Sequence, residues 1–271
     1  MQATADIEPT GAGRPADAPI LAAERVSKRF GGVAAVDGVS LSVPRGSIAG
    51  LIGPNGAGKT TMFDCLAGEH RPTAGRILLQ GVPVEREGPH RRVGRGLART
   101  FQIPRPFAAL SLVENVMLGR QAQAGERILP NWLAPRRVAR EERETFERAM
   151  ALLEFVSLAH LAREPARVLS GGQRKLLELA RALMAEPAIM LLDEPAAGVN
   201  PSLLEVIIAR IAELNARGMS FLVIEHNMDM VARLCRHVFV MASGRLLCEG
   251  RPDEIAADPR VVEAYLGGAA A

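Results

Sequence analysis

A short glycine-rich segment carries the strongest chemical signal in the chain. Residues 53–60 read Gly-Pro-Asn-Gly-Ala-Gly-Lys-Thr and fit the phosphate-loop pattern G-x-x-x-x-G-K-[ST]. The glycines would let backbone N–H groups curl around phosphate oxygens, Lys59 would reach the β and γ phosphates, and Thr60 could ligate Mg²⁺. A bare glycine-rich turn is the alternative. The residues expected to contact Mg-ATP are Gly53, Pro54, Asn55, Gly56, Ala57, Gly58, Lys59, Thr60 and Thr61.

Two adjacent acids follow an apolar run later in the chain. Residues 189–192 read Ile-Met-Leu-Leu and precede Asp193 and Glu194, a pattern typical of a buried strand with carboxylates at its end. In phosphoryl transfer, one carboxylate holds Mg²⁺ and another orients or deprotonates the attacking water. We expect Asp193 to take the first role and Glu194 the second. Taken alone, the pair could equally be a solvated strand end.

A second glycine pair stands in residues 169–173, which read Leu-Ser-Gly-Gly-Gln, directly before a helix expected from Arg174. Ser170 could simply cap that helix, and the glycines could simply form a turn. Exposed N–H groups at a helix N-terminus beside a hydroxyl also form an anion site.

The expected elements place these groups where a nucleotide site needs them. An apolar strand at 47–52 leads into the phosphate loop, and the helix Lys59–Ala67 follows it and ends at Gly68. Strands alternate with helices again after residue 174, which indicates an α/β domain with a largely parallel sheet. Other expected strands are 21–27, 39–43, a hairpin at 76–84, 188–192, 221–224, 238–241 and 246–248, and other expected helices are 174–185, one from Asn200-Pro201, and 228–234. Residues 103–170 are rich in proline and have helical spacing at 142–156, so we expect a mostly helical subdomain inserted in the core.

Composition excludes some classes of function. The net charge is only +3 and Arg alternates with Asp and Glu, so no basic tract indicates nucleic-acid binding. No run of 18 apolar residues exists to span a bilayer, and the N-terminus lacks the pattern of a signal peptide. Residues 1–18 are expected to be a disordered lead-in and residues 19–271 one domain. Work at a membrane would require docking onto another chain.

In their order and spacing, these motifs resemble those of ATP-binding-cassette (ABC) ATPases over about residues 20–266. Leu169–Gln173 reproduces the family signature. The resemblance implies a phosphate-loop NTPase core with an N-terminal antiparallel β-subdomain and the inserted helical subdomain. It also implies that Phe30 stacks on adenine, that Gln102 senses Mg²⁺ and the attacking water, and that His226 contacts the γ-phosphate. The implied catalytic residues are Glu194, His226 and Gln102, the metal ligands are Thr60, Gln102 and Asp193, and the signature residues Ser170, Gly171, Gly172 and Gln173 bind the nucleotide of a paired ATPase.

One residue departs from the family pattern. Asn200 stands where many such ATPases carry an Asp that reaches across the dimer. Asn caps a helix about as well as Asp, so the local fold should survive. The charge of that Asp is missing, so any electrostatic coupling that it carries is in doubt here.

Four stretches more narrowly resemble the ATPase subunits of branched-chain amino acid importers, namely residues 99–105, 193–198, 224–229 and 258–267. Residues 121–144 resemble an insertion found in one of the two paired ATPases of those systems. Urea- or amide-type importers and the lipopolysaccharide-export ATPase share parts of these motifs and are alternatives. A soluble non-transport ABC ATPase is disfavoured by the single phosphate loop and the lack of sustained heptads. A catalytically inactive module is disfavoured by Glu194 and His226.

The resemblance implies an ATPase that drives transport with ATP and Mg²⁺ as cofactors. The implied partners are a second ABC ATPase subunit, in a heterodimer by preference or else a homodimer, and membrane permease subunits. The implied location is the cytoplasmic face of the inner membrane. The sequence does not identify the transported substrate, because specificity in such importers lies in other chains.

Overall fold

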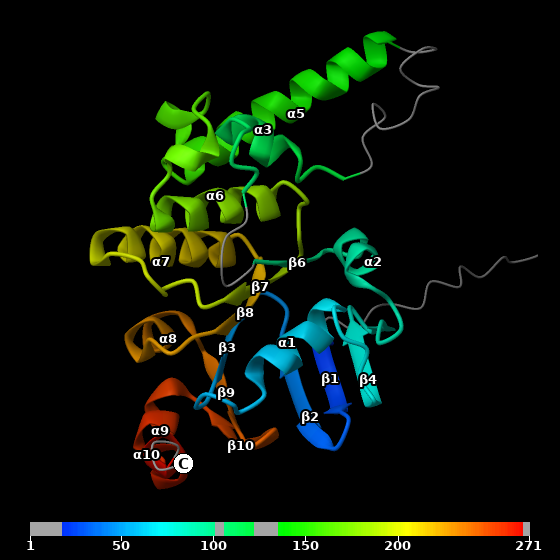
Figure 1. Cartoon of the computed structure of the whole chain (residues 1–271), viewed down its shortest axis with the longest axis vertical. Helices are drawn as coiled ribbons and strands as arrows, with labels where there is room; N and C mark the ends of the chain where they lie inside the picture. Colours follow the sequence, from blue (N-terminus) through cyan, green and yellow to red (C-terminus); the bar gives the residue numbers. More distant parts are fainter. Residues whose placement is uncertain (1–17, 101–105, 122–134, 268–271) are drawn as a thin grey trace, which may run out of the picture.

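The computed structural model describes residues 18–100, 106–121 and 135–267. Its strands form two sheets, and in Figure 1 one group of helices lies above them and others lie beside and below them. The predicted lead-in at 1–18 lies outside the described residues except for its last member. The division into this lead-in, an ATPase domain at 19–271 and a helical subdomain at 103–170 stays a prediction.

The first sheet is antiparallel and has the strand order β2-β1-β4-β5. Its strands are β1 (Leu21–Phe30), β2 (Val33–Val43), β4 (Ala74–Leu79) and β5 (Val82–Pro83). The first two strands are longer than predicted because they pair with each other from Leu21↔Val43 to Phe30↔Val33 around a tight turn. The hairpin at 76–84 is confirmed, with Gln80 and Gly81 at φ 52° and 78°, as a two-residue turn between twisted strands favours.

The second sheet is mixed and has the strand order β10-β9-β3-β8-β7-β6. Its strands are β3 (Ile48–Ile52), β6 (Leu97–Arg99), β7 (Ile189–Asp193), β8 (Ser220–Ile224), β9 (His237–Ala242) and β10 (Arg245–Gly250). All neighbouring strands are parallel except β10, which pairs antiparallel with β9. Every residue of β3, β7 and β8 is buried, as in a parallel sheet that is covered on both faces.

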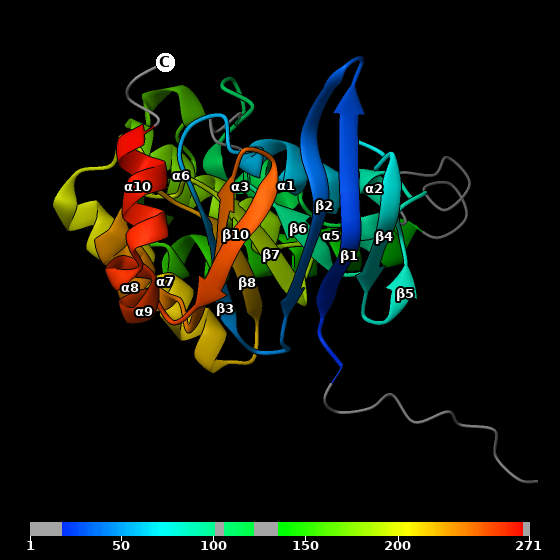
Figure 2. The ribbon, with the colours of Figure 1, turned by 90° about the horizontal axis from the view of Figure 1, so that it is seen from below.

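Helices cover both faces of the mixed sheet. On one face, α1 (Lys59–Ala67) lies between the two sheets, and Met62, Phe63 and Leu66 pack into the core that they share (Figure 2). On the other face lie α6 (Gly171–Leu183), α7 (Pro201–Ala216) and α8 (Met228–Leu234) over a second apolar cluster. The sheet thus has one core on each side, and the two cores hold the carboxyl ends of its strands in place.

Further helices lie at the two ends of the molecule in Figure 1. At the upper end, α3 (Leu112–Met117) and α5 (Pro135–Phe155) contact each other and α6. The short helices η2 (Ala159–Leu161) and η3 (Ala166–Val168) connect them to α6, and α2 (Pro89–Gly94) precedes β6. At the lower end lie α9 (Pro252–Ala257) and α10 (Pro259–Gly267).

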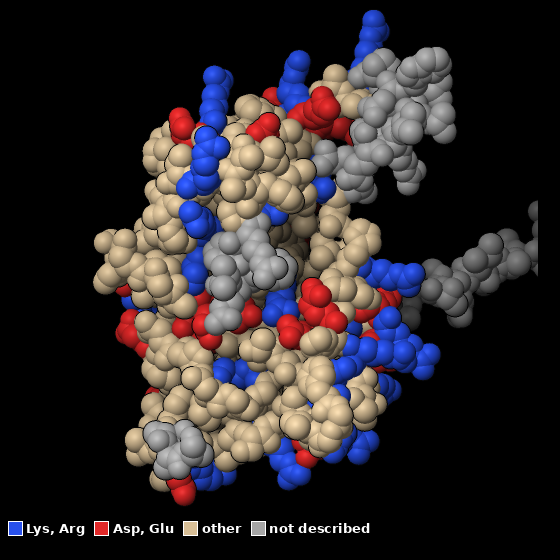
Figure 3. All heavy atoms as spheres, in the orientation of Figure 1, with Lys and Arg blue, Asp and Glu red and all other residues tan. Residues whose placement is uncertain are grey.

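The surface carries both signs of charge. On the face shown in Figure 3, Lys and Arg side chains project from the upper end among acidic side chains, as the alternating charges of the sequence predict. Within residues 18–100, 106–121 and 135–267, no helix combines the length and the apolar character needed to cross a membrane.

Candidate nucleotide-binding site

The phosphate loop connects β3 to α1, as predicted. Gly53 has φ 146°, and a Cβ at this position would lie 2.1 Å from the carbonyl oxygen of Met241. Gly58 has φ 93°, and its Cβ would lie 2.2 Å from the carbonyl oxygen of Ala35. Both positions therefore require glycine, both for backbone conformation and for space. The backbone of the loop therefore lies close to β2 and β9 at these two glycines.

Lys59 begins α1 and is almost fully buried at 7% exposure. Its ammonium donates hydrogen bonds to the carbonyl oxygens of Gly53 (2.7 Å) and Pro54 (2.9 Å). Burial lowers the pKa of Lys59, and the nearby charges of Glu194 and Asp193 oppose this shift. An ammonium has three N–H donors, so this one can fasten the loop and still donate to an anion.

A cavity of about 550 Å³ opens beside the loop. This volume lies in the range of small-molecule sites, which are usually hundreds of cubic ångströms. The cavity is lined by Val33, Ala34, Ala35, Asn55, Gly56, Ala57, Gly58, Lys59, Thr60, Thr61, Glu194, His226, Ser243 and Gly244. The fold therefore brings the predicted loop together with the predicted acid Glu194 and the predicted His226, both more than a hundred residues further along the chain.

Glu194 and His226 lie side by side at the cavity. The Nε2 atom of His226 is 3.2 Å from Oε1 of Glu194. Glu194 directly follows β7, and His226 follows the neighbouring strand β8. Because both strands are parallel, their carboxyl ends meet at one edge of the sheet. An acid and an imidazole in contact beside a phosphate loop can orient a water molecule and accept its proton.

Asp193 ends β7 and is 6% exposed. It does not line the cavity itself, although its charge acts on Lys59. Arg99 lies between two carboxylates, with its Nη2 atom 3.2 Å from Asp193 and its Nη1 atom 2.6 Å from Asp64. Burial raises the pKa of Asp193, and the hydrogen bond from Arg99 opposes this shift. Arg99 thus helps to keep a buried acid ionised.

The donor types around the loop fit Mg²⁺. Thr60 presents a hydroxyl to the cavity and Asp193 supplies a carboxylate, and hard oxygen ligands are what Mg²⁺ prefers. In the part of the chain that the structure describes, no three His, Cys, Asp or Glu side chains form a metal cage. Mg²⁺ at nucleotide sites commonly takes only one or two protein ligands beside phosphates and waters. The third predicted ligand, Gln102, lies outside the described residues.

The signature residues lie away from this cavity. Ser170 caps α6, and its Oγ atom accepts a hydrogen bond from the amide of Gln173, whose side chain accepts one from the amide of Ser170. A Cβ at Gly172 would lie 2.2 Å from the end of the Leu203 side chain, which would have to move to accommodate it. Gly171 is exposed and has open space around its Cβ position. The capping role is therefore confirmed, and the anion role stays a prediction.

Phe30 lies at the end of β1 and is not among the residues that line the cavity. Its ring is 45% exposed, meets His70 edge to face at 5.3 Å, and has the Lys28 ammonium 5.0 Å from its centre. Its neighbour across the turn, Val33, does line the cavity. An exposed ring beside the cavity is free to stack on a base, and that role stays a prediction.

Four residues of the site were not identified from the sequence. Arg99 bridges two acids, Lys175 and Glu225 hold the backbone around Glu194, and Tyr265 binds the phosphate loop. Each acts through a partner that is at least 19 residues away in the chain, so its role could not be read from its neighbours. The stretches 99–105, 224–229 and 258–267 did contain Arg99, Glu225 and Tyr265. The scarcity of Lys, with only three in the chain, was the one available signal for Lys175.

Asn200 caps α7 by accepting a hydrogen bond from the amide of Leu203, as predicted.

Comparison with known proteins gives the family. A model described as "ABC transporter" matches residues 36–197, and one described as "Branched-chain amino acid ATP-binding cassette transporter" matches residues 245–271. The chain is 41% identical over 252 residues to the "Probable branched-chain amino acid transport ATP-binding protein LivG" of Archaeoglobus fulgidus, and the match covers 92% of this chain and 95% of the relative. It is 40% identical to the "High-affinity branched-chain amino acid transport ATP-binding protein BraF" of Pseudomonas aeruginosa, with coverage of 93% and 99%.

A solved structure has the same fold. The ADP conformation of MJ1267, an ATP-binding cassette of an ABC transporter, matches with a TM-score of 0.79 at 37% identity, and the match covers 92% of this chain and 99% of that one. The predicted combination of an antiparallel sheet with a largely parallel one is therefore confirmed. Because the similarity extends over nearly the whole chain and includes the phosphate loop, the chain belongs to the ABC transporter family, as an ATP-binding subunit of the LivG/BraF type that couples ATP hydrolysis to transport.

Proposed function

We propose that Mg-ATP binds in the cavity beside the phosphate loop and that Glu194 is the general base of its hydrolysis. The observation that carries this proposal is the contact between Glu194 and His226 at that cavity. Loop amides and Lys59 would hold the β and γ phosphates. Glu194 would accept the proton of the attacking water, and His226 would orient that water and the γ-phosphate.

Mg²⁺ would be held by Thr60 and Asp193, together with Gln102. When bound, it neutralises charge that develops on the phosphate oxygens. The residues of the chain then have three separate tasks. The loop binds and orients the triphosphate, Arg99 keeps Asp193 charged, and the Glu194–His226 pair handles the proton of the water.

A single isosteric substitution tests the role of Glu194. We expect Glu194→Gln to bind ATP as the wild type does and to lose about 100-fold or more in turnover, since general-base groups contribute about 10²–10⁴-fold. The measurements are binding of a fluorescent ATP analogue and release of phosphate. Glu205→Gln, which alters an exposed acid on α7, is the matched control. Normal turnover of Glu194→Gln would exclude this mechanism.

The signature segment supports a paired state. Ser170–Gln173 do not line the cavity of their own chain, which supports the proposal that they serve the nucleotide of another ATPase subunit. We propose that this subunit is a second, similar ABC ATPase, and that the pair docks on membrane permease subunits at the cytoplasmic face. Co-purification of the full-length chain with both kinds of partner from membranes tests this arrangement. A soluble complex with nucleic acid would contradict it.

We further propose that the transported substrate is a branched-chain amino acid. The support comes from the names of the LivG and BraF relatives and from the match of residues 245–271 to the branched-chain transporter model. Uptake of labelled leucine should be lost in cells that lack this chain, and should return with the wild-type chain but not with Glu194→Gln. Unchanged leucine uptake in such cells, or loss of urea uptake instead, would overturn this assignment.

A further inference from the structure

The backbone at Glu194 has a conformation that side chains rarely adopt. Its φ is 48°, in the left-handed region that favours glycine. The amide of Ala197 donates back to the carbonyl oxygen of Glu194 at 3.1 Å, which closes a tight turn directly after β7. Such a conformation persists only when its surroundings impose it. Two charged side chains from other parts of the chain do so here.

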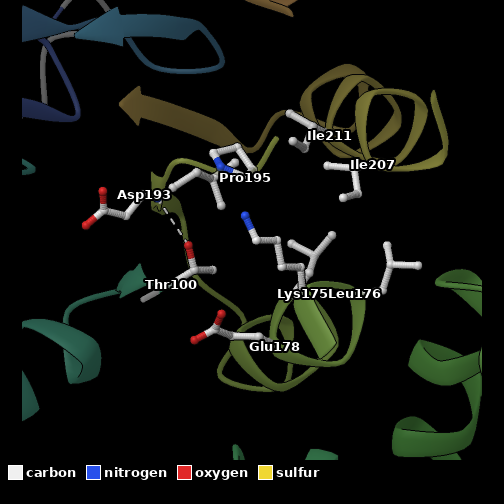
Figure 4. Close-up of a pocket in the computed structure, with 10 residues that line it drawn as sticks. Thr100, Lys175, Leu176, Glu178, Asp193, Pro195, Ile207 and Ile211 are labelled. Atoms are coloured by element: carbon white, nitrogen blue, oxygen red, sulfur yellow. Dashed lines mark hydrogen bonds between the residues drawn. The ribbon is translucent and has the colours of Figure 1, made fainter. Parts of the chain in front are cut away.

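Lys175 holds this turn from the side of α6. Its Nζ atom donates a hydrogen bond to the carbonyl oxygen of Glu194 at 2.5 Å. Figure 4 shows its side chain extending from α6 toward the turn that contains Pro195. Burial lowers the pKa of Lys175, and the charges of Glu225 and Glu194 oppose this shift. A half-buried ammonium in this place therefore depends on the acids that surround it.

Glu225 holds the same turn from the side of β8. Its side chain is 2% exposed, and its Oε1 atom accepts a hydrogen bond from the amide of Ala196 at 2.6 Å. Its other oxygen accepts from the amides of His226 (2.9 Å) and Asn227 (3.0 Å). One buried carboxylate therefore connects the segment after Glu194 with the segment that contains His226.

We propose that Lys175 and Glu225 are positioning residues for hydrolysis, which together fix the backbone of Glu194 and its distance to His226. This inference rests on the proposed role of Glu194 as the base. Neither side chain lines the nucleotide cavity, so each acts through the residues that it holds. A misplacement of a reacting group by about 1 Å can reduce a rate about 100-fold, so a small shift of this turn is enough to matter.

We call Lys175 and Glu225 the clamp of the turn at Glu194. The clamp also connects two sites that would serve different nucleotides. Lys175 lies on α6 only two residues after Gln173, the last residue of the signature segment. A movement of the N-terminus of α6 would therefore act on the carbonyl group of Glu194 through one hydrogen bond. By this route, engagement of the signature with a neighbouring subunit's ATP would align the base in its own chain.

A small cavity beside Lys175 leaves room for a conservative substitution that tests its role. It has a volume of about 30 Å³ and is lined by Thr100, Leu176, Glu178, Leu192, Asp193, Pro195, Ile207 and Ile211 among others. This space is enough for about one or two water molecules, so the larger head group of arginine has room to enter. Lys175→Arg keeps a donor for the carbonyl oxygen of Glu194, whereas Lys175→Met keeps only the apolar stem.

The first experiment uses the full-length chain under conditions in which the wild type turns over ATP. We expect Lys175→Met to bind a fluorescent ATP analogue within about twofold of the wild type and to lose at least about tenfold in kcat, a typical effect of a displaced catalytic group. Lys175→Arg should recover most of kcat. Asn215→Ala removes a side chain that donates to two backbone carbonyl groups away from the site, so it should lower Tm without lowering kcat. A kcat for Lys175→Met equal to that of Asn215→Ala would overturn the proposal.

The second experiment removes one acceptor of Glu225. In Glu225→Gln, one carboxylate oxygen becomes an amide nitrogen that faces a backbone N–H group. We expect faster hydrogen exchange at the amide of residue 196, or at the amides of residues 226 and 227, whichever faces the new nitrogen, with the rest of the chain unchanged, and a fall in kcat like that of Lys175→Met. Glu205→Gln is the matched control. Unchanged exchange with normal kcat would refute the clamp.

The two proposals can fail separately. If Glu194→Gln is inactive and both clamp variants are normal, only this inference fails. If Glu194→Gln is active, the proposed function fails first.

Discussion

At the scale of single residues, the buried charge of Asp193 is unfavourable for stability but is needed for the role that we propose for it. Its carboxylate is buried at the end of a strand, where a charge is unfavourable, and burial raises its pKa. Arg99 compensates in part, since it is shared between Asp193 and Asp64. A chain selected for stability alone would place an uncharged residue here. The proposed role of Asp193 as a Mg²⁺ ligand accounts for the acid at this position, because a carboxylate is an oxygen ligand that Mg²⁺ prefers.

Asp193→Asn should therefore stabilise the folded chain at neutral pH. Because burial raises the pKa of Asp193 above its unfolded value, the folded state keeps this proton at pH values where the unfolded state has lost it. The free energy of unfolding then falls as the pH rises through this window. Above the folded pKa, the folded state bears the full cost of burying the ionised carboxylate. The gain in the variant should be on the order of 1 kcal/mol at pH 7 and should shrink as the pH falls through that window. Thermal unfolding at several pH values measures it, and Mg²⁺-dependent ATP binding should be weakened.

Asp258→Asn is the matched control with the opposite sign. Hydrogen bonds from Arg260 lower the pKa of Asp258 to about 2. A lowered pKa contributes stability above the unfolded value, so this variant should be less stable at neutral pH. A loss of stability in Asp193→Asn as well would show that the hydrogen bond from Arg99 outweighs burial.

At the scale of elements, the sequence predicts best those segments whose ends carry their own signals. The helix Lys59–Ala67 has the predicted bounds because Gly68 ends it in the left-handed conformation. The helix predicted from Arg174 begins three residues earlier, at Gly171, because Ser170 and Gln173 form a capping box.

Other parts depend on tertiary contacts. The strand β6 has three residues and is stabilised by its pairing with β7. It is too short for an alternation of apolar and polar residues to reveal it in the sequence. The short helices α2, α9 and α10 were not predicted either, although α2 and α9 begin with a proline in the first turn. In the site, the motif residues were predictable because the loop and strand ends are local patterns. Lys175 and Glu225 were not, because their partners are 19 and 29 residues away.

The phosphate loop should tolerate a methyl group only where the structure has room. In Gly58→Ala, the new Cβ would lie 2.2 Å from the carbonyl oxygen of Ala35 at a φ of 93°. We expect a loss of about 3 kcal/mol or more in stability, as for overpacking combined with backbone strain, together with loss of ATP binding. Gly88→Ala is the control, since Gly88 has a φ of −75° and open space, and it should change stability by less than about 0.5 kcal/mol. Equal unfolding midpoints for the two variants would contradict this account of the loop.

The C-terminal helix α10 is fastened to the phosphate loop by one hydrogen bond. The amide of Gly53 donates to the hydroxyl oxygen of Tyr265 at 2.9 Å, across 212 residues of sequence. Tyr265→Phe keeps the ring and removes this acceptor, so we expect a loss of about 1 kcal/mol in stability and faster hydrogen exchange in residues 259–267. Leu266→Ala, at a position 71% exposed, should leave both unchanged. Unchanged exchange in Tyr265→Phe would show that other contacts hold α10.

At the scale of the whole molecule, the described chain keeps apart two surfaces that we propose contact nucleotides. One surface is the cavity with the phosphate loop, Glu194 and His226. The other is the N-terminus of α6, where Ser170 and Gly171 are exposed. A hydrogen bond from Lys175 on α6 to the carbonyl oxygen of Glu194 connects the two sides. The arrangement is suited to a pair of subunits in which each supplies what the other lacks.

Gly171→Asp should separate ATP binding from ATP turnover in such a pair. Gly171 is exposed and has nothing within 4 Å of its Cβ position, so the chain should fold, and an acid in the first turn of α6 should even favour the helix. The new charge would face the phosphates held by the neighbouring subunit. A like-charge contact of this kind costs several kcal/mol, which corresponds to a loss of turnover of at least about 100-fold. ATP affinity of the variant's own cavity should remain within about twofold of the wild type. Gly88→Asp makes the same change at the start of α2, also in open space, and should leave turnover intact. Weaker ATP binding by the isolated Gly171→Asp chain would mean instead that α6 serves the nucleotide of its own subunit, because only then could the charge act without a neighbour.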